Sequence, residues 1–195
     1  MATTRTEVQE RNEPEWLAEL PLTGGPVVRF RHVRPDDEPL ITDAIRTASR
    51  ETLLHRFFSP IRSVSPSMLR QMLAIDRAKE TCIVGVTKEQ GAARMVCGAR
   101  YVKLPAGEAA EFAITVHDDF QRRGLGKFLL KLLAGLAVAE GIQRFEADVM
   151  NSNQKMLNLF RKATSSRAGW HRTEDIHHVV LELSTLTNQE SGLMP

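Results

Sequence analysis

The chain of 195 residues carries 26 Lys and Arg against 24 Asp and Glu, so that its formal net charge is only +2. Its hydrophobic content of 42% and charged content of 26% are ordinary for a globular protein with one core. This charge balance does not predict nucleic-acid binding. The sequence has no run of about 18 apolar residues, so no membrane span is predicted. Its polar start lacks the apolar region of a signal peptide. We therefore expect a cytoplasmic protein without a membrane or nucleic-acid partner.

The ends of the chain differ in composition from its middle. Residues 1–25 are polar, carry mixed charges and close on a glycine-proline turn, so we predict an N-terminal extension there. Within the extension, the segment 15–20 predicts one helical turn that docks through Trp16. Residues 26–185 are predicted to form a single domain, and residues 186–195 a C-terminal tail.

The first half of this domain predicts a strand followed by helices. Val27–Val33 alternates as a strand does, and the acidic turn that begins at Pro35 precedes apolar residues at helical spacing up to Ala48. A second helix is predicted over residues 65–75, where a Ser-Pro start precedes another apolar stripe. The apolar and basic segment 53–58 between them has no clear period.

The second half predicts an antiparallel meander and then alternating helices and strands. Hairpin breaks at residues 88–91 and 105–107 separate three predicted strands, which span Thr81–Thr87, Ala93–Leu104 and Ala109–His117. A long amphipathic helix over Gly126–Glu140, a strand over Phe145–Val149, a helix over Asn153–Ala163 and a strand over His177–Leu183 follow. The order β-αα-βββ-α-β-α-β predicts an α+β fold with a mixed, mostly antiparallel sheet flanked by helices.

The sequence offers no metal site. Cys82 and Cys97 both lie in apolar runs without partners at ligand spacing, so that we expect two small buried side chains. The pair His177-His178 likewise lacks further ligands nearby. No metal cofactor is expected.

The segment Gln121-Arg122-Arg123-Gly124-Leu125-Gly126 joins a predicted strand to the strongest predicted helix. The first turn of a helix has unpaired N–H groups and a partial positive charge, which together bind anions. Glycines allow the backbone to approach a phosphate closely and to adopt a positive φ. The arginines and Lys127 add positive charge, so that the segment predicts a phosphate-binding loop.

Two other nucleotide loops fit less well. A dinucleotide-binding turn is suggested by Gly124-Leu125-Gly126 and by Glu146, about 20 residues further on. However, Leu129 stands at the position of the third glycine, and residues 117–123 are too many for the tight turn of that fold. A P-loop is excluded because no Gly-Lys-Ser/Thr follows at the required spacing.

The loop resembles the Q/R-x-x-G-x-G/A motif of the GNAT acetyltransferase superfamily, and the order of elements is similar from residue 27 to residue 163. A closer similarity is to the acetyltransferase domain of bacterial Pat-type protein-lysine acetyltransferases. It rests on Val33–Leu40, Arg56-Phe57-Phe58 and Ala110–Ile114. The resemblance implies the GNAT fold and transfer of an acetyl group from acetyl-CoA to a primary amine. A protein lysine, for example on an acyl-CoA synthetase, is the expected acceptor.

The resemblance also implies the residues that hold acetyl-CoA. By position, its pyrophosphate would be bound by Arg122, Arg123, Gly124, Leu125, Gly126 and Lys127. The pantetheine arm would pair with the strand at Ile114, Thr115 and Val116, and Asn153 would lie near it.

Glu111 is the best candidate for the general base. A lysine amine is charged at neutral pH, and freeing it of its proton costs roughly 4–5 kcal/mol, so a carboxylate or histidine is needed beside it. Glu111 lies in a mostly apolar strand, where partial desolvation would raise its pKa. In Pat-type enzymes a glutamate at a similar place acts as the base. A solvent-facing strand residue is the alternative, and His117 is a second candidate at the end of the strand.

The sequence departs from the family at two places. Many GNAT enzymes carry a tyrosine as general acid where this chain has Phe160. After Ala163, Thr164-Ser165 replaces the usual Gly-Phe, so that the final strands are expected to be displaced. Arg46, Arg50, Arg56 and Arg62 lie near the expected acceptor cleft, either as ordinary surface charges or to recognise an anionic substrate.

Several functions therefore remain open. Acetyl transfer with Glu111 as base is favoured, with a small-molecule amine as the alternative acceptor. Phe160 and the altered segment after Ala163 would suit a module that binds acyl-CoA without turnover. Oxidoreduction with a nucleotide is the third possibility.

Overall fold

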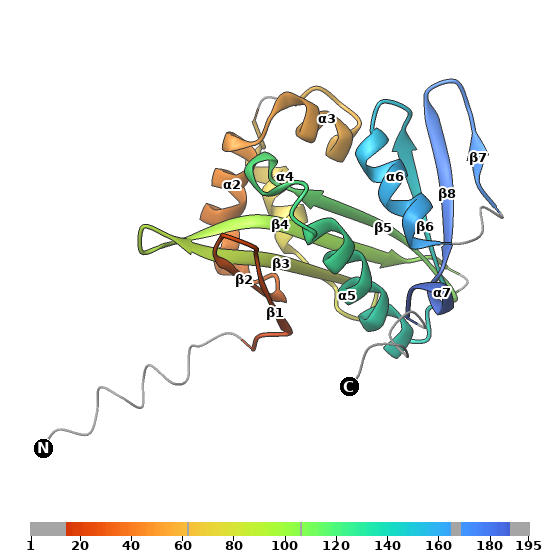
Figure 1. Ribbon diagram of the computed structural model, residues 1–195, viewed down its shortest axis with the longest axis horizontal. Coiled ribbons are helices and arrows are strands. Elements are labelled where there is room, and N and C mark those ends of the chain that lie inside the picture. The colour runs from red at the N-terminus through yellow and green to blue at the C-terminus, as the bar shows by residue number, and fades with distance from the viewer. Residues whose placement is uncertain (1–14, 62, 106, 165–168, 188–195) are drawn as a thin grey trace, which may run out of the picture.

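The structure, a computed structural model, describes residues 15–61, 63–105, 107–164 and 169–187. Its centre is an eight-stranded sheet in the order β1-β2-β3-β4-β5-β6-β8-β7 (Figure 1). Only β5 and β6 are parallel neighbours, and all other pairs are antiparallel. The strands are β1 (Ala18–Pro21), β2 (Val27–His32), β3 (Glu80–Glu89), β4 (Ala92–Lys103), β5 (Ala109–Val116), β6 (Arg144–Met150), β7 (His171–Arg172) and β8 (Ile176–Glu182).

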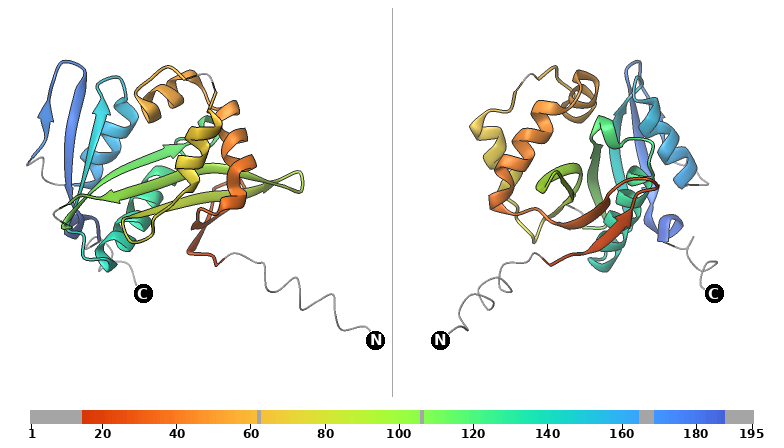
Figure 2. Two further views of the ribbon diagram at one scale, coloured as in Figure 1. Left: turned by 180° about the vertical axis from the view of Figure 1, so that it is seen from behind. Right: turned by 60° about the vertical axis from the view of Figure 1, so that its left-hand side comes forward.

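Helices cover both faces of the sheet, as the views of Figure 2 show. On one face, α5 (Leu125–Ala139), α6 (Gln154–Ala163) and α7 (Leu183–Thr187) enclose the larger core, in which Leu129 and Leu133 are fully buried. On the other face, α2 (Glu38–Thr47) and α4 (Pro66–Leu73) pack over β3 and β4. The short helix α3 (Arg50–Phe57) contacts β5. The predicted α+β fold with a mixed, mostly antiparallel sheet is thereby confirmed.

The predicted elements differ from the observed ones mainly near the N-terminus. The helical turn predicted over residues 15–20 is wrong, because Ala18–Pro21 pairs with Val27–Phe30 as an edge strand. Of the segment 53–58, which showed no period, residues 53–57 belong to an additional helix, α3, and Phe58 is its C-cap. The boundaries of the extension, the domain and the tail themselves stay predictions, although β1 brings part of the predicted extension into the sheet.

The parallel strands β5 and β6 separate along their length. They pair only from Ala109↔Arg144 to Glu111↔Glu146, although β5 continues to Val116 and β6 to Met150. In Figure 1 the two strands start side by side and diverge toward α3 and α6. The backbone groups of β5 beyond Glu111 therefore have no strand partner on the side of β6. Such an edge is open to pairing with an extended ligand.

A buried ion pair fixes the connection between β2 and α2. The Arg31 guanidinium donates two hydrogen bonds to the Asp37 carboxylate, at 2.6 and 2.7 Å, and both residues are at most 7% exposed. The backbone N–H of Arg34 donates to the same carboxylate at 2.8 Å. This contact places the start of α2, which lines the apolar pocket described below.

Candidate active site

A cleft of about 660 Å³ opens where β5 and β6 diverge. Its floor is β5, and its walls are α3, the loop before α5, and α6. Two contacts bridge α3 to the start of α6 across the cleft: His55 Nε2 lies 3.1 Å from Ser152 Oγ, and Lys155 Nζ lies 3.6 Å from a Glu51 oxygen. The cleft is therefore framed by segments that are far apart in the sequence.

The loop before α5 has the positive φ angles that its glycine allows. Arg122 and Gly124 both have positive φ, at 60° and 86°. The N–H groups of Leu125, Gly126 and Lys127 belong to the first turn of α5, whose amides have no acceptor within the helix. A Cβ at Gly124 would meet no heavy atom within 4 Å, so the backbone is bare at this point. The geometry suits an anionic group at the N-terminus of α5.

The six residues of the predicted phosphate site do not all face the cleft. Arg122, Gly124, Gly126 and Lys127 line it. The Arg123 side chain instead lies over the ring of Phe120, at 5.3 Å from its centroid. Leu125 is 1% exposed, so that only its backbone can meet a ligand.

Gln121 ties the loop to the rest of the cleft. Its side-chain amide donates to Thr52 Oγ1 at 3.2 Å and to the Val116 carbonyl at 3.1 Å, and its oxygen accepts from Lys155 at 2.9 Å. Nearby, the Asp118 carboxylate accepts from the backbone and hydroxyl of Ser49 and from Thr52. These contacts connect α3, the end of β5 and α6 to one another around the cleft.

The three residues predicted to meet a pantetheine arm line the cleft floor. Ile114, Thr115 and Val116 follow the point at which pairing with β6 ends. Asn153 lines the same cleft, but its side-chain oxygen is already engaged as the N-cap of α6, accepting from the Met156 N–H at 3.2 Å. The structure thus brings the predicted binding residues together, except for the side chain of Arg123 and the buried side chain of Leu125.

Glu111 is at the point where β5 and β6 part. It pairs with Val102 on one side and with Glu146 on the other, and alternation places it on the same face of β5 as Ala113 and Thr115. The predicted desolvation is wrong, because Glu111 is exposed to solvent. The larger core lies on the opposite face of the strand, which leaves this carboxylate at an open rim.

His117 and Phe160 are both engaged elsewhere. His117 is 6% exposed, and its ring lies 3.0 Å from Thr47 Oγ1 and 3.2 Å from Arg94. Phe160 is 2% exposed and packs on Phe112 at 5.4 Å between ring centroids. Neither side chain is placed to exchange a proton with a molecule in the cleft.

The final long strand is a regular member of the sheet. β8 pairs with β6 along the whole of β6, from Arg144↔Glu182 to Met150↔Ile176. The displacement of the final strands relative to the family stays a prediction. Of the segment that departs from the family, residues 165–168 lie outside the described part of the chain.

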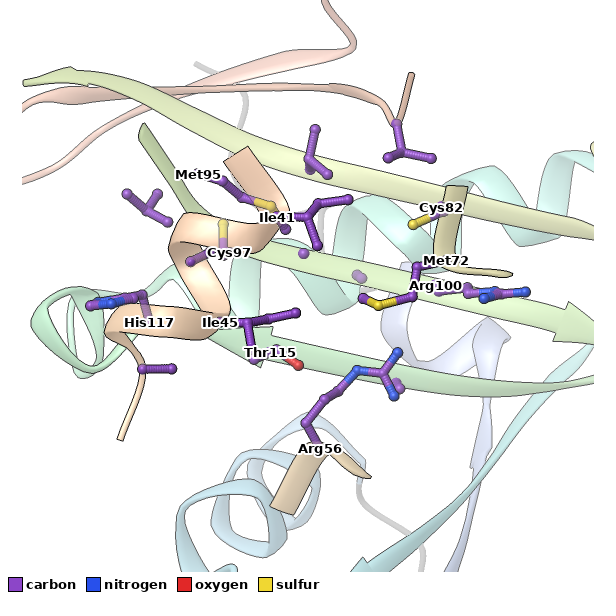
Figure 3. Close-up of a pocket in the computed structure, with 18 of the residues that line it drawn as sticks. Ile41, Ile45, Arg56, Met72, Cys82, Met95, Cys97, Arg100, Thr115 and His117 are labelled. Atoms are coloured by element: carbon purple, nitrogen blue, oxygen red, sulfur yellow. The ribbon is translucent and has the colours of Figure 1, made fainter. Parts of the chain in front are cut away.

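A second, apolar pocket of about 100 Å³ adjoins the cleft on the face covered by α2 and α4 (Figure 3). Thr52, Arg56 and Thr115 line both cavities. Figure 3 shows Arg56 reaching from α3 toward the sheet, on the side where Thr115 and Arg100 project. Burial lowers the pKa of Arg56, with a smaller effect in the same direction from the Arg100 charge, and Arg remains protonated in proteins.

Sequence reasoning missed most of the cleft walls. It did not assign Thr52 and His55 of α3, or Lys155, Asn158 and Lys162 of α6, to the cleft. One signal was available for α3: Ser49 is a helix N-cap, whose hydroxyl accepts from the Thr52 N–H at 3.1 Å. For α6, only the tertiary structure shows which face of the helix lines the cleft.

The described residues contain no group of three or more His, Cys, Asp or Glu side chains that could hold a metal ion. None of their helices combines the length and the apolar character needed to cross a membrane.

The site and fold have known relatives. The family described as acetyltransferase (GNAT) matches residues 48–164. The acetyltransferase Pat of Mycolicibacterium smegmatis is 33% identical over 155 residues, which cover 79% of this chain and 44% of that protein. The acetyltransferase PA5475 of Pseudomonas aeruginosa is 29% identical over 138 residues, covering 71% of this chain and 74% of that protein. The chain thus spans less than half the length of the M. smegmatis protein.

Among solved structures, the GNAT domain of S. lividans PAT has the same fold. The two superpose with a TM-score of 0.72 at 25% sequence identity. The match covers 85% of this chain and 96% of that domain.

Proposed function

The chain belongs to the acetyltransferase (GNAT) family, and from this premise we propose that it transfers an acetyl group from acetyl-CoA to a primary amine, with Glu111 as general base. The observation that carries the proposal is the separation of β5 from β6 beside the bare N-terminus of α5. The open edge of β5 would pair with the pantetheine arm, and the first-turn N–H groups of α5 would hold the pyrophosphate. The thioester would then lie near the point of divergence, beside Glu111.

The proposed chemistry is a direct attack in a ternary complex. Glu111 accepts a proton from the ammonium group, directly or through a water molecule that its exposure allows. The neutral amine nitrogen forms a bond to the thioester carbon, the carbon–sulfur bond breaks, and the cationic nitrogen loses its second proton to water to give the neutral amide. The thiolate leaves with its electron pair and takes a proton from water, because Phe160 offers none. A free thiol pKa near ~8.5 makes this departure tolerable.

We propose a protein lysine as acceptor, in the cytoplasm. The support is the similarity to two acetyltransferases, one of them named Pat, and to the GNAT domain of S. lividans PAT. A lysine on an acyl-CoA synthetase is the first acceptor to try. A small-molecule amine is the second candidate, supported by the apolar pocket that adjoins the cleft.

Thiol release from acetyl-CoA tests the proposed function. The acceptors are an acyl-CoA synthetase, lysine peptides and small polyamines, and calorimetry measures acetyl-CoA binding in parallel. Turnover with any of these amines would support acetyl transfer and name the acceptor class. Binding without turnover would favour a module that senses acyl-CoA, and a lack of binding would contradict both readings.

The backbone at Gly124 supplies a prediction about the phosphate loop. Gly124→Ala is expected to weaken acetyl-CoA binding by about 10-fold or more, because a left-handed φ costs an L-residue roughly 1–2 kcal/mol and the loop would shift to avoid it. Calorimetric titration with acetyl-CoA measures the change.

Gly135→Ala is the matched control, since Gly135 is an exposed glycine of α5 without positive φ. It should bind acetyl-CoA as the wild type does and be more stable by about 0.5–1 kcal/mol. Equal affinities for the wild type and Gly124→Ala would remove the loop from the proposed site.

A further inference from the structure

The described lining of the apolar pocket beside the cleft carries positive charge but no acidic side chain. Its charged lining side chains, among the described residues, are Arg56 and Arg100, and no Asp or Glu lines it. Arg100 forms an ion pair with Glu80 outside the lining. Arg56 makes no hydrogen bond or ion pair within the described residues, and its guanidinium only approaches the ring of Phe57, at 5.4 Å. The charge of Glu111 also acts on Arg56, but no described acid accepts a hydrogen bond from its guanidinium, so its donors are free for a ligand.

Two further donors near Arg56 lack partners. Thr115 Oγ1 and Arg100 Nε are buried without a hydrogen-bond partner among the described atoms. Buried polar groups are almost always satisfied, so that an orphaned donor calls for an explanation. These two groups come from neighbouring strands, β5 and β4, where Thr115 stands opposite Gly98 and Arg100 opposite Ala113. In Figure 3 they and Arg56 border the same cavity.

The chemistry of these groups restricts what they can bind. A guanidinium only donates hydrogen bonds, in a planar fork that matches a carboxylate, and a hydroxyl can add one more. The rest of the lining is mainly apolar, with Ile45, Leu53 and Met72 among its members. An aliphatic group that ends in a carboxylate suits both features. Polar atoms that are shielded from water without a partner are costly unless a ligand satisfies them, as Thr115 Oγ1 and Arg100 Nε would be here.

We propose that Arg56, Arg100 and Thr115 form a subsite for a carboxylate carried by one of the two substrates. The inference rests on the proposed function in one respect, namely that the thioester lies beside the shared wall of Thr52, Arg56 and Thr115. The carboxylate belongs either to the acceptor, as in an amino acid, or to the acyl group of the donor, as in succinyl-CoA. In both cases the subsite selects a charged substrate over its neutral counterpart.

Equilibrium binding tests the subsite without requiring turnover. In the donor arm, calorimetry compares succinyl-CoA with butyryl-CoA. In the acceptor arm, the chain with and without CoA is titrated with an aliphatic amino acid and with the primary amide of the same amino acid. The affinity ratio of the charged to the neutral ligand is expected to reach about 10-fold or more in one arm, as for other hydrogen bonds to charged groups. The arm that shows the preference identifies which substrate carries the carboxylate.

Variants assign the preference to the subsite. Arg56→Met should bring the ratio to within about 2-fold of unity, because the charged donor is lost, and a ratio is insensitive to a general loss of affinity. Thr115→Val should lower the ratio less. Arg50→Met is the matched control, since Arg50 is exposed at the start of the same helix and lines neither cavity. It should keep the wild-type ratio.

The two proposals fail in different ways. Ratios near unity in both arms for the wild type, or a ratio unchanged by Arg56→Met, would overturn the subsite while acetyl-CoA binding and acetyl transfer persist. Failure to bind acetyl-CoA would overturn the proposed function instead. In that case the acceptor arm on the chain without CoA would still decide whether the carboxylate subsite exists.

Discussion

Replacing Glu111 by Gln is expected to lower kcat for acetyl transfer by about 10²- to 10⁴-fold, the usual contribution of a positioned general base. The amide keeps the shape of the side chain but cannot accept the ammonium proton, so that only the small neutral fraction of the amine reacts. The Kd for acetyl-CoA should not change, because Glu111 is absent from the lining of the cleft. Thiol release at saturating acetyl-CoA and calorimetric titration measure the two quantities.

Glu108→Gln is the matched control for this substitution. Glu108 is an exposed glutamate just before the same strand, and its side chain forms no hydrogen bond or ion pair with the described residues. It should leave both kcat and Kd at wild-type values. A Glu111→Gln enzyme that retains most of its turnover would show that water or another group removes the proton.

Asp37→Ala is expected to lower the free energy of unfolding by about 3–5 kcal/mol, as loss of one partner of a buried ion pair does. The change leaves the Arg31 guanidinium, whose side chain is only 9% exposed, without its carboxylate. It also removes the acceptor of the Arg34 N–H. The hydrogen bond from Arg31 to Asp37 raises the pKa of Arg31, against the opposing effect of burial. Urea unfolding followed by circular dichroism measures the loss.

Asp36→Ala controls for the removal of a carboxylate from the same turn. The Asp36 side chain is 67% exposed, and its one ion pair within the described part of the chain is with Arg34, so the free energy of unfolding should change by no more than about 0.5 kcal/mol. The double change Arg31→Met and Asp37→Leu should be less destabilising than Asp37→Ala, because it leaves no buried charge unpaired. Equal stability of Asp36→Ala and Asp37→Ala would show that the ion pair does not matter.

The sequence by itself determined the elements whose signals are local. The strands around the meander and the long helix α5 follow from alternation and from an apolar stripe, since each element buries one side against the same core. The phosphate loop could be predicted because Gly124 and the start of a helix carry their chemistry in adjacent residues. Glu111 could be named because the resemblance to Pat-type enzymes pointed to it.

Elements with little burial of their own escaped prediction. In α3 only Leu53 is buried, so that no apolar period appears in its eight residues. The edge strand β1 has four residues, of which none is fully buried, and it exists because the backbone of β2 offers a partner. The local sequence predicts neither α3 nor β1, because the contacts that stabilise these two elements come from other segments.

Only the tertiary structure decided how the site is assembled. The divergence of β5 from β6 depends on the register of two strands separated by the whole of α5, and it opens the cleft. The exposure of Glu111 follows from its place at that divergence, which alternation along one strand cannot show. The position of the Arg123 side chain over Phe120 likewise depends on the path of the loop. Arg56, Arg100 and Thr115 come from three elements, and their charges and unpaired donors meet because α3 is held against β5 by Asp118 and Gln121.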